Sequence, residues 1–97
     1  MTMPAGSQQE SGAFARALSA EVRATLARQR VTAKQLAHDS GMSPNYLGKR
    51  LRDEASLTAN DIEAICVALG EDLQSFILAA LGGSDTEPAT RPIPRIQ

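Results

Sequence analysis

The first third of the chain carries one long run of apolar residues at helical spacing. These residues recur every four positions and therefore share one side of a helix: Phe14, Leu18, Val22 and Leu26. Ser11 suits the N-cap of this helix, because a serine hydroxyl can accept a hydrogen bond from a free backbone N–H. The pattern predicts a first helix that begins after Ser11 and runs to about Arg30, with its apolar side in the core.

Two shorter segments follow, and each has helix signals at its ends. Thr32, with Gln35 three residues later, forms a capping-box pattern, and Gly41 suits the left-handed residue that ends a helix. Ser43 then suits an N-cap, and Pro44 suits the first position of the next helix, where its missing N–H costs nothing. The pattern predicts two short helices joined by a tight turn, over residues 33–40 and 44–52.

Two further segments have a period close to that of a helix. Their expected N-caps are Thr58 and Asp72, and they are expected to end at Gly70 and at Gly82-Gly83. The apolar residues of the first are Ile62, Ile65, Cys66 and Leu69. The apolar residues of the second are Leu73, Phe76, Ile77, Leu78 and Leu81. No strand pattern and no internal repeat is present, so we predict an all-α bundle of five short helices.

Composition changes at both ends of the chain. Residues 1–11 are small and polar, and residues 84–97 contain three prolines and no apolar periodicity. We therefore expect one folded domain over residues 12–82, between a disordered segment 1–11 and a flexible tail 83–97. No apolar run is long enough for a membrane span, and the N-terminus does not resemble a secretory signal. A single cysteine fits a reducing cytoplasm.

Charge is unevenly distributed, although the net charge is only −1. Residues 13–54 hold eight cations and four anions, a balance of +4. Residues 55–90 hold six anions and no lysine or arginine. A basic half beside an acidic half favours one face that meets phosphates and another turned away from them, although a solvated mixture of charges is the alternative.

The helix predicted over residues 44–52 has an apolar side and a polar, cationic side. At about 100° per residue, Leu47 and Leu51 point the same way. Three polar residues point away from them: Asn45, Lys49 and Arg52. Because asparagine can bond adenine and lysine or arginine can bond guanine in the major groove, we expect this side to contact bases. Gly48 in mid-helix costs about 1 kcal/mol relative to alanine. Close approach to a base, or close packing against the preceding helix, would each explain the glycine.

A second set of residues is placed to contact phosphates. Tyr46 and Arg50 lie on the flanks of the same helix, although Tyr46 could instead pack against Leu36 and the first helix. Lys34 lies at a helix start whose free N–H groups favour anions, and Arg23 lies off the apolar stripe of the first helix. The residues expected to contact phosphates are Arg23, Thr32, Lys34, Gln35, Tyr46 and Arg50.

Several short motifs resemble one known family, the Cro/repressor-type helix-turn-helix domain, also called the xenobiotic-response-element family. The motifs that carry the resemblance are Leu36-Ala37, Gly41-Met42-Ser43, Leu47 and Leu69-Gly70. The resemblance covers about residues 13–81 and implies a lambda-repressor-like bundle of five helices. It also implies sequence-specific binding to double-stranded DNA, usually as a homodimer on a two-fold operator. Transcriptional repression is the commonest outcome among the phage and bacterial members.

The resemblance also implies where bases are read. By position, the family's readers correspond to Ser43, Asn45, Gly48 and Lys49. With Arg52 from the helical geometry, these residues are the expected base-reading set. The sequence departs from the family at Pro44, where many relatives have a base-reading glutamine, and at Arg50, where the family has an apolar residue.

The last helix is the expected contact between two copies. Leu78 lies off the apolar stripe and would be exposed in a monomer, which favours a dimer contact there. We expect Phe76, Ile77 and Leu81 to be chiefly core. The residues expected at the dimer contact are Phe76, Leu78 and Leu81. An alternative function is an antitoxin-like or anti-repressor module that binds a protein partner through the last two helices or through the tail.

Nothing in the sequence indicates an enzyme, a metal or a cofactor. His38 is expected to be a solvated or capping residue, and Cys66 a core residue, with redox sensing as the alternative. Asp53 and Glu54 are adjacent in a loop beside Arg52 and are expected to be solvated rather than to form a catalytic pair. The sequence therefore favours a binding protein over a catalyst.

Overall fold

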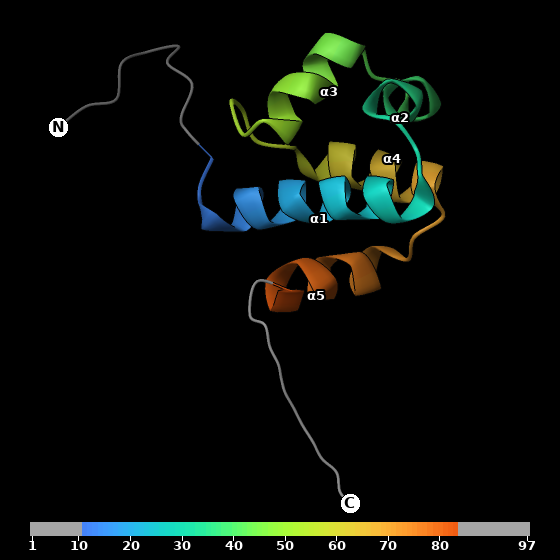
Figure 1. Cartoon of the computed structure of the whole chain (residues 1–97). Helices are drawn as coiled ribbons and strands as arrows, with labels where there is room; N and C mark the ends of the chain where they lie inside the picture. Colours follow the sequence, from blue (N-terminus) through green and yellow to red (C-terminus); the bar gives the residue numbers. More distant parts are fainter. Residues whose placement is uncertain (1–10, 84–97) are drawn as a thin grey trace, which may run out of the picture.

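The computed structural model describes residues 11–83, which form five helices in the predicted order (Figure 1). The helices are α1 (Ala13–Gln29), α2 (Ala33–Ser40), α3 (Pro44–Leu51), α4 (Ala59–Leu69) and α5 (Leu73–Gly83). No strand occurs within residues 11–83, and the predicted all-α fold is confirmed. The predicted disordered segment, except Ser11, and the predicted tail, except Gly83, lie outside the described residues.

Local sequence sets most of the helix ends. The side-chain oxygens of Thr32, Ser43 and Thr58 each accept a hydrogen bond from the backbone N–H three residues later, as an N-cap does. Gly41 and Gly70 end α2 and α4 with φ of 76° and 70°, in the left-handed region that glycine enters without a Cβ clash. These predicted ends are confirmed, but the capping box expected at Thr32 does not form, because the side chain of Gln35 bonds Asp39. The complete capping box is that of Thr58 and Asp61.

The predicted N-cap of α1 is wrong. Gly12 is the N-cap residue, and it supplies no side-chain hydrogen bond. Ser11 is buried instead, where its Oγ accepts a hydrogen bond from Ser56 Oγ at 3.3 Å. Its carbonyl oxygen accepts a hydrogen bond from the guanidinium of Arg16. The contact with the loop before α4 therefore replaces the local cap.

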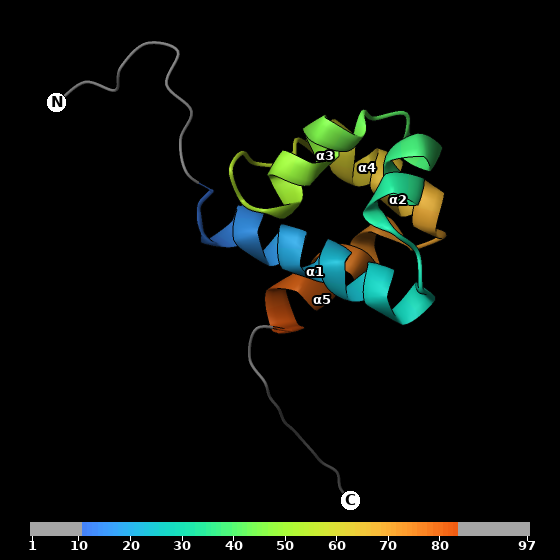
Figure 2. The same ribbon diagram turned by 45° about the horizontal axis from the view of Figure 1, so that its top comes forward.

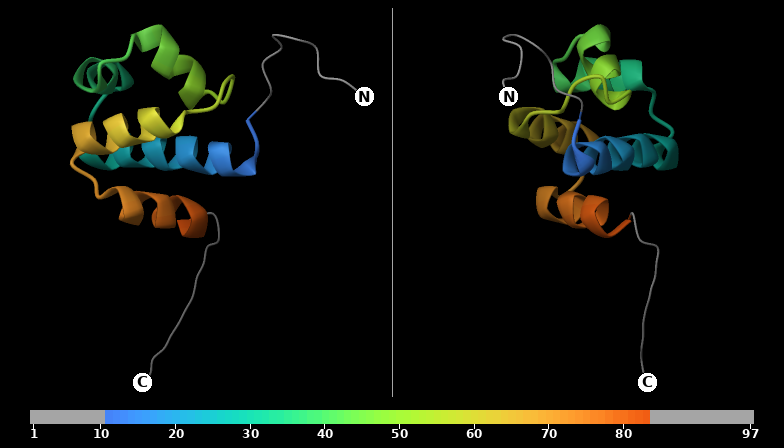
Figure 3. Two further views of the ribbon diagram at one scale, coloured as in Figure 1. Left: turned by 180° about the vertical axis from the view of Figure 1, so that it is seen from behind. Right: turned by 90° about the vertical axis from the view of Figure 1, so that its left-hand side faces the viewer.

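The helices form three levels in space. α1 and α4 lie at the middle level, with α2 and α3 on one side of it and α5 on the other (Figures 1 and 3). α2 packs against α3 and α4, while α5 packs chiefly against α1. The largest fully buried apolar side chains come from all five helices: Val22, Leu36, Leu47, Ile65 and Phe76. One continuous core therefore holds α3 against the rest of the domain.

The packing of α1 and α5 corrects three expectations and confirms one. Phe14, at the start of the apolar stripe of α1, is 52% exposed, and Leu81, expected in the core, is also 52% exposed. Phe76 is 2% exposed, which confirms it as a core residue but contradicts its expected place at a dimer contact. Because α5 is covered on one side only, its other apolar residues stay at the surface.

Within the described residues, no single helix has the length and apolar composition needed to cross a membrane. α4 and α5 together reach the required length and apolar composition, but the two helices are bent by 108° relative to each other.

Candidate nucleic-acid interface

The helix α3 presents one side to the core and the other to solvent. Leu47 and Leu51 are buried, as the helical angles predict. The Ser43 Oγ accepts a hydrogen bond from the backbone N–H of Tyr46 at 3.0 Å, which caps the start of the helix. Figure 2 shows α3 at the outside of the molecule, beside α2. The polar side of α3 is therefore open to a large partner.

The C-terminal end of α3 is held by α1. Ser19 Oγ donates to the carbonyl oxygen of Arg50 at 3.0 Å, and Arg23 Nη1 donates to that of Leu51 at 2.6 Å. These carbonyls lie in the last turn of α3, beyond the bonds within the helix, although that of Arg50 also accepts the backbone N–H of Asp53 at 3.1 Å. Arg23 Nη1 also lies 3.8 Å from a carboxylate oxygen of Asp53. Arg23 thus positions α3 in the free protein, and the sequence alone indicated neither this role nor any role for Ser19.

The first turn of α3 is held by α4. The hydroxyl of Tyr46 donates to Oδ2 of Asp61 at 2.8 Å, and the same oxygen accepts the backbone N–H of Thr58 at 3.0 Å. The guanidinium of Arg50 lies 3.6 Å from the centre of the Tyr46 ring, a distance at which cation and ring attract each other. Both side chains lie on the flanks of α3 and are half-buried. The hydrogen-bond partner of Tyr46 belongs to α4, which the sequence did not indicate.

We expect Tyr46 to titrate at a higher pH than a free tyrosine. Its hydrogen bond to the Asp61 carboxylate raises the pKa of Tyr46 above the usual 10.0; burial and the charge of Asp61 act in the same direction, and Arg50 acts against them. Because the folded pKa is raised, this contribution to stability is present below the unfolded pKa of about 10 and is lost as the pH rises through the folded value. Tyr46 is the only tyrosine and the chain has no tryptophan, so absorbance reports its ionisation directly.

The matched variants for this titration are Asp61→Asn and Glu63→Gln. Asp61→Asn keeps an oxygen for the cap at Thr58 but removes the charge, so the titration midpoint of Tyr46 should fall. Glu63→Gln removes a neighbouring carboxylate from α4 that does not bond Tyr46, so the titration midpoint of Tyr46 should remain that of the wild type. A wild-type midpoint at or below that of a free tyrosine would contradict the bond.

Two exposed side chains on α3 have no hydrogen-bond or ion-pair partner within residues 11–83: Asn45 and Lys49. Arg52 is also exposed, but its Nε donates to Oε2 of Glu54 at 2.8 Å. This bond raises the pKa of Arg52 and lowers that of Glu54, to which Lys49 adds a smaller lowering. An exposed pair of this kind contributes little to stability, so Arg52 can exchange Glu54 for another anion or a base.

Gly48 leaves open space on the exposed side of α3. A methyl group added there would meet only the guanidinium of Arg52, with Nη1 at 3.0 Å and Cζ at 3.9 Å. No atom of α2 lies within 4 Å of that position, so close packing against α2 does not explain the glycine. Close approach to a base stays a prediction.

At the start of α2, one cation is free among the residues expected to contact phosphates. Lys34 is exposed and has no hydrogen-bond or ion-pair partner in the part of the chain that the structure describes. The side chain of Thr32 accepts the backbone N–H of Gln35 at 3.0 Å, and Gln35 Nε2 donates to Oδ1 of Asp39 at 2.8 Å. Lys34 is thus the residue of this group with an uncommitted charge.

Solved structures resemble this arrangement of helices. The clp gene regulator ClgR from C. glutamicum is similar at a TM-score of 0.69 and 27% identity, over 79% of this chain and 100% of that chain. A second structure of ClgR, from Corynebacterium glutamicum, is similar at a TM-score of 0.67 and 30% identity, over 78% of this chain and 79% of that one. A hypothetical transcription factor from Neisseria, NHTF, shares the fold at a TM-score of 0.60 and 20% identity, over 78% and 84% of the two chains.

The sequence itself matches one family. No curated protein sequence matches the chain. The helix-turn-helix family matches residues 22–76, which include all of α2, the turn at Gly41 and all of α3. The resemblance to Cro/repressor-type domains is thereby confirmed: the chain belongs to the helix-turn-helix family of DNA-binding transcription regulators.

Proposed function

We propose that this chain binds a two-fold DNA operator as a homodimer, with α3 in the major groove, and represses transcription there. The observation that carries the proposal is that α3 is fixed on its inner side and exposed on its outer side. Its inner side is fixed to the core, to α1 and to α4, while Asn45 and Lys49 on its outer side are exposed and unpaired within residues 11–83. A rigid helix with free donors is what reading base edges requires.

Each proposed base contact follows from side-chain chemistry. Asn45 can bond adenine through two atoms, and Lys49 can donate to O6 and N7 of guanine. Ser43 lies at the N-terminal end of α3, and Gly48 lets the helix backbone come close to a base or a thymine methyl. Arg52 can contact a base once its bond to Glu54 is broken. The proposed base-reading set is Ser43, Asn45, Gly48, Lys49 and Arg52.

The proposed phosphate contacts lie around this set. Lys34, at the start of α2, combines a free ammonium with the N–H groups of a helix N-terminus. Thr32 and Gln35 lie beside it, and Tyr46 and Arg50 flank α3. Arg23 contributes by holding α3 in place, and its charge adds to the attraction for the backbone. These contacts orient the domain on the duplex without reading its sequence.

The distribution of charge supports the same orientation. Two cations without a hydrogen-bond or ion-pair partner within residues 11–83, Lys34 and Lys49, lie on the α2–α3 side, whereas α4 and α5 carry no lysine or arginine. α5 lies on the opposite side of α1 from α3 (Figure 1). A duplex that approaches α3 therefore meets the basic half of the chain and stays away from the acidic half.

The proposed dimer contact lies on α5. Leu78 is 60% exposed and Leu81 is 52% exposed, and apolar side chains grouped on one helix favour burial against a second copy. A two-fold contact through α5 would leave both α3 helices free for successive major grooves. Repression would follow when the bound dimer excludes other proteins from a promoter in the cytoplasm.

Selection of binding sites from a random DNA pool tests the proposal. The full chain should enrich a two-fold symmetric sequence, and its affinity for that sequence should fall steeply as salt rises, because bound phosphates release counterions. An enriched site without symmetry would remove the dimer from the proposal. No enrichment over random DNA would overturn it and would favour the alternative of an antitoxin-like or anti-repressor module.

A further inference from the structure

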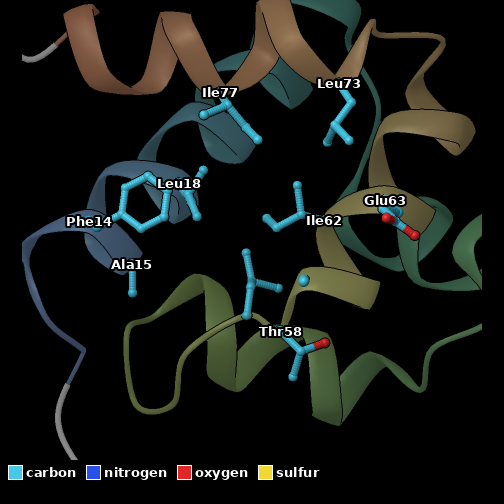
Figure 4. A pocket seen from close by; sticks show the side chains of 10 residues that line it. Phe14, Ala15, Leu18, Thr58, Ile62, Glu63, Leu73 and Ile77 are labelled. Carbon is cyan, nitrogen blue, oxygen red and sulfur yellow. The ribbon is translucent and has the colours of Figure 1, made fainter.

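An apolar groove lies between α1, α4 and α5, and the end of the loop that joins α3 to α4 forms part of its wall (Figure 4). Its volume is about 250 Å³. Its apolar walls are formed by Phe14, Leu18, Leu57, Ile62, Leu73 and Ile77. Phe14 is 52% exposed and Leu73 is 38% exposed, and no residue within 11–83 covers them. Adjoining apolar walls of this kind mark a binding surface more often than isolated exposed residues do.

The surroundings of the groove are acidic. Glu63 of α4 lines it, and Figure 4 shows this carboxylate at the edge near Leu73. Residues 55–83, which supply most of the walls, contain no lysine or arginine. The cation of α1 nearest in sequence to Phe14 is Arg16, and its guanidinium is bonded to the carbonyl oxygen of Ser11. The groove therefore fits an occupant that is apolar and cationic.

Two parts of the chain outside the described residues are candidates for this occupant. In residues 1–10 the only charged side chain is Glu10, an anion. Residues 91–97 read R-P-I-P-R-I-Q and alternate two arginines with two isoleucines. The charge of the groove thus selects the C-terminal segment over the N-terminal one.

The C-terminal segment also has suitable spacing. Ile93 stands between two prolines, which restrict the backbone to an extended form and reduce the entropy lost on binding. In such an extended helix of three residues per turn, Ile93 and Ile96 lie on one side. That side would face the apolar walls and leave the arginines at the edges.

The segment can reach the groove in its own chain. The end of α5 and the start of α1, with Phe14, lie on the same side of the molecule in Figures 1 and 3. Ile93 lies ten positions after Gly83, a span of up to about 33 Å. From Gly83 back to Ile77, α5 covers only about 9 Å. A tether of this length holds its end at an effective concentration on the order of mM, so a weak contact suffices.

We propose that residues 91–97 dock into the α1–α4–α5 groove of their own chain. Ile93 and Ile96 contact the walls at Phe14 and Ile77, and an arginine of the segment pairs with Glu63. The docked segment covers the groove beside the exposed face of α5 and leaves α3 free.

A tryptophan reporter tests this proposal in the full chain. The sequence contains no tryptophan, so Ile93→Trp places a single tryptophan at the proposed contact, and excitation on the red side of tyrosine absorbance selects it over Tyr46. Its emission should be blue-shifted and protected from a soluble quencher. Adding Phe14→Ser or Glu63→Lys should move the emission towards that of a solvent-exposed indole; both replaced side chains are exposed, so the fold should persist. The matched control is Val67→Ser, because Val67 is 83% exposed on α4 and does not line the groove.

Three results would overturn the proposal. The first is a reporter that is already solvent-exposed in the full chain. The second is a blue shift that Phe14→Ser and Glu63→Lys leave unchanged, or that Val67→Ser removes equally. The third is a blue shift that disappears on dilution, since that would place the segment on a second copy. A blue shift that is independent of protein concentration and lost in both groove variants supports docking within one chain.

Discussion

Replacing Leu47 with alanine should lower the free energy of unfolding by about 2–5 kcal/mol, the usual range for a leucine deleted from a core. Leu47 is 0% exposed and lies on the inner side of α3, where it joins the core shared by all five helices. Small domains are stable by only about 5–15 kcal/mol in total, so the variant should lose a large share of its stability. Urea unfolding followed by circular dichroism measures the effect.

The matched control for Leu47→Ala lies two positions earlier on the same helix. Asn45 is exposed and has no hydrogen-bond partner within residues 11–83, so Asn45→Ala should change stability by less than about 0.5 kcal/mol. If the two variants lost stability equally, α3 would not be packed through Leu47. The same pair also separates folding from recognition, since Asn45→Ala should weaken DNA binding in a chain that remains folded.

Replacing Lys49 with alanine should cost about 1–3 kcal/mol of binding free energy at the selected operator and relax the preference at one base. The ammonium of Lys49 is exposed on the outer side of α3, one helical turn beyond Asn45, and no partner within residues 11–83 occupies it. Binding isotherms on the selected site, on its single-base variants and on random DNA measure the affinity and the preference together.

Lys34→Ala is the matched variant for Lys49→Ala, because it removes the same charge from α2 rather than α3. It should weaken binding to specific and random DNA alike and reduce the slope of affinity against salt by about 1. If Lys49→Ala also lost the same affinity on specific and random DNA, Lys49 would contact a phosphate and not a base. The two lysines thus divide the proposed interface into a reading part and a positioning part.

The helix ends and the inner side of α3 could be predicted because they depend on neighbours in sequence. Thr32 and Ser43 cap through the N–H three residues later, and Leu47 and Leu51 share a side by helical period alone. No distant residue is needed to decide either. The prediction of Ser11 as the N-cap of α1 was wrong because it depended on a distant residue: Ser11 bonds Ser56, 45 positions away.

The support of α3 could not be predicted because it depends on contacts between separate helices. Ser19 meets the carbonyl of Arg50 across 31 positions, and Tyr46 meets Asp61 across 15. The sequence shows each of these residues as an ordinary polar position on its own helix. Burial of Leu81 was likewise wrongly predicted, because a helical period identifies an apolar side but not how much of it a neighbouring helix covers.

Residues of α3 that are bonded to other helices and residues of α3 that are not have different consequences for how such a protein evolves to bind a new DNA sequence. Tyr46 and the carbonyl of Arg50 are tied to other helices, so a change at Tyr46 disturbs the fold as well as the interface. Asn45 and Lys49 have no such ties within residues 11–83, so mutations there alter the surface without altering what holds it. Under the proposed mode of binding, a duplicated gene could therefore diverge towards another DNA sequence through a few substitutions on the outer side of α3, while the domain keeps its stability at every step.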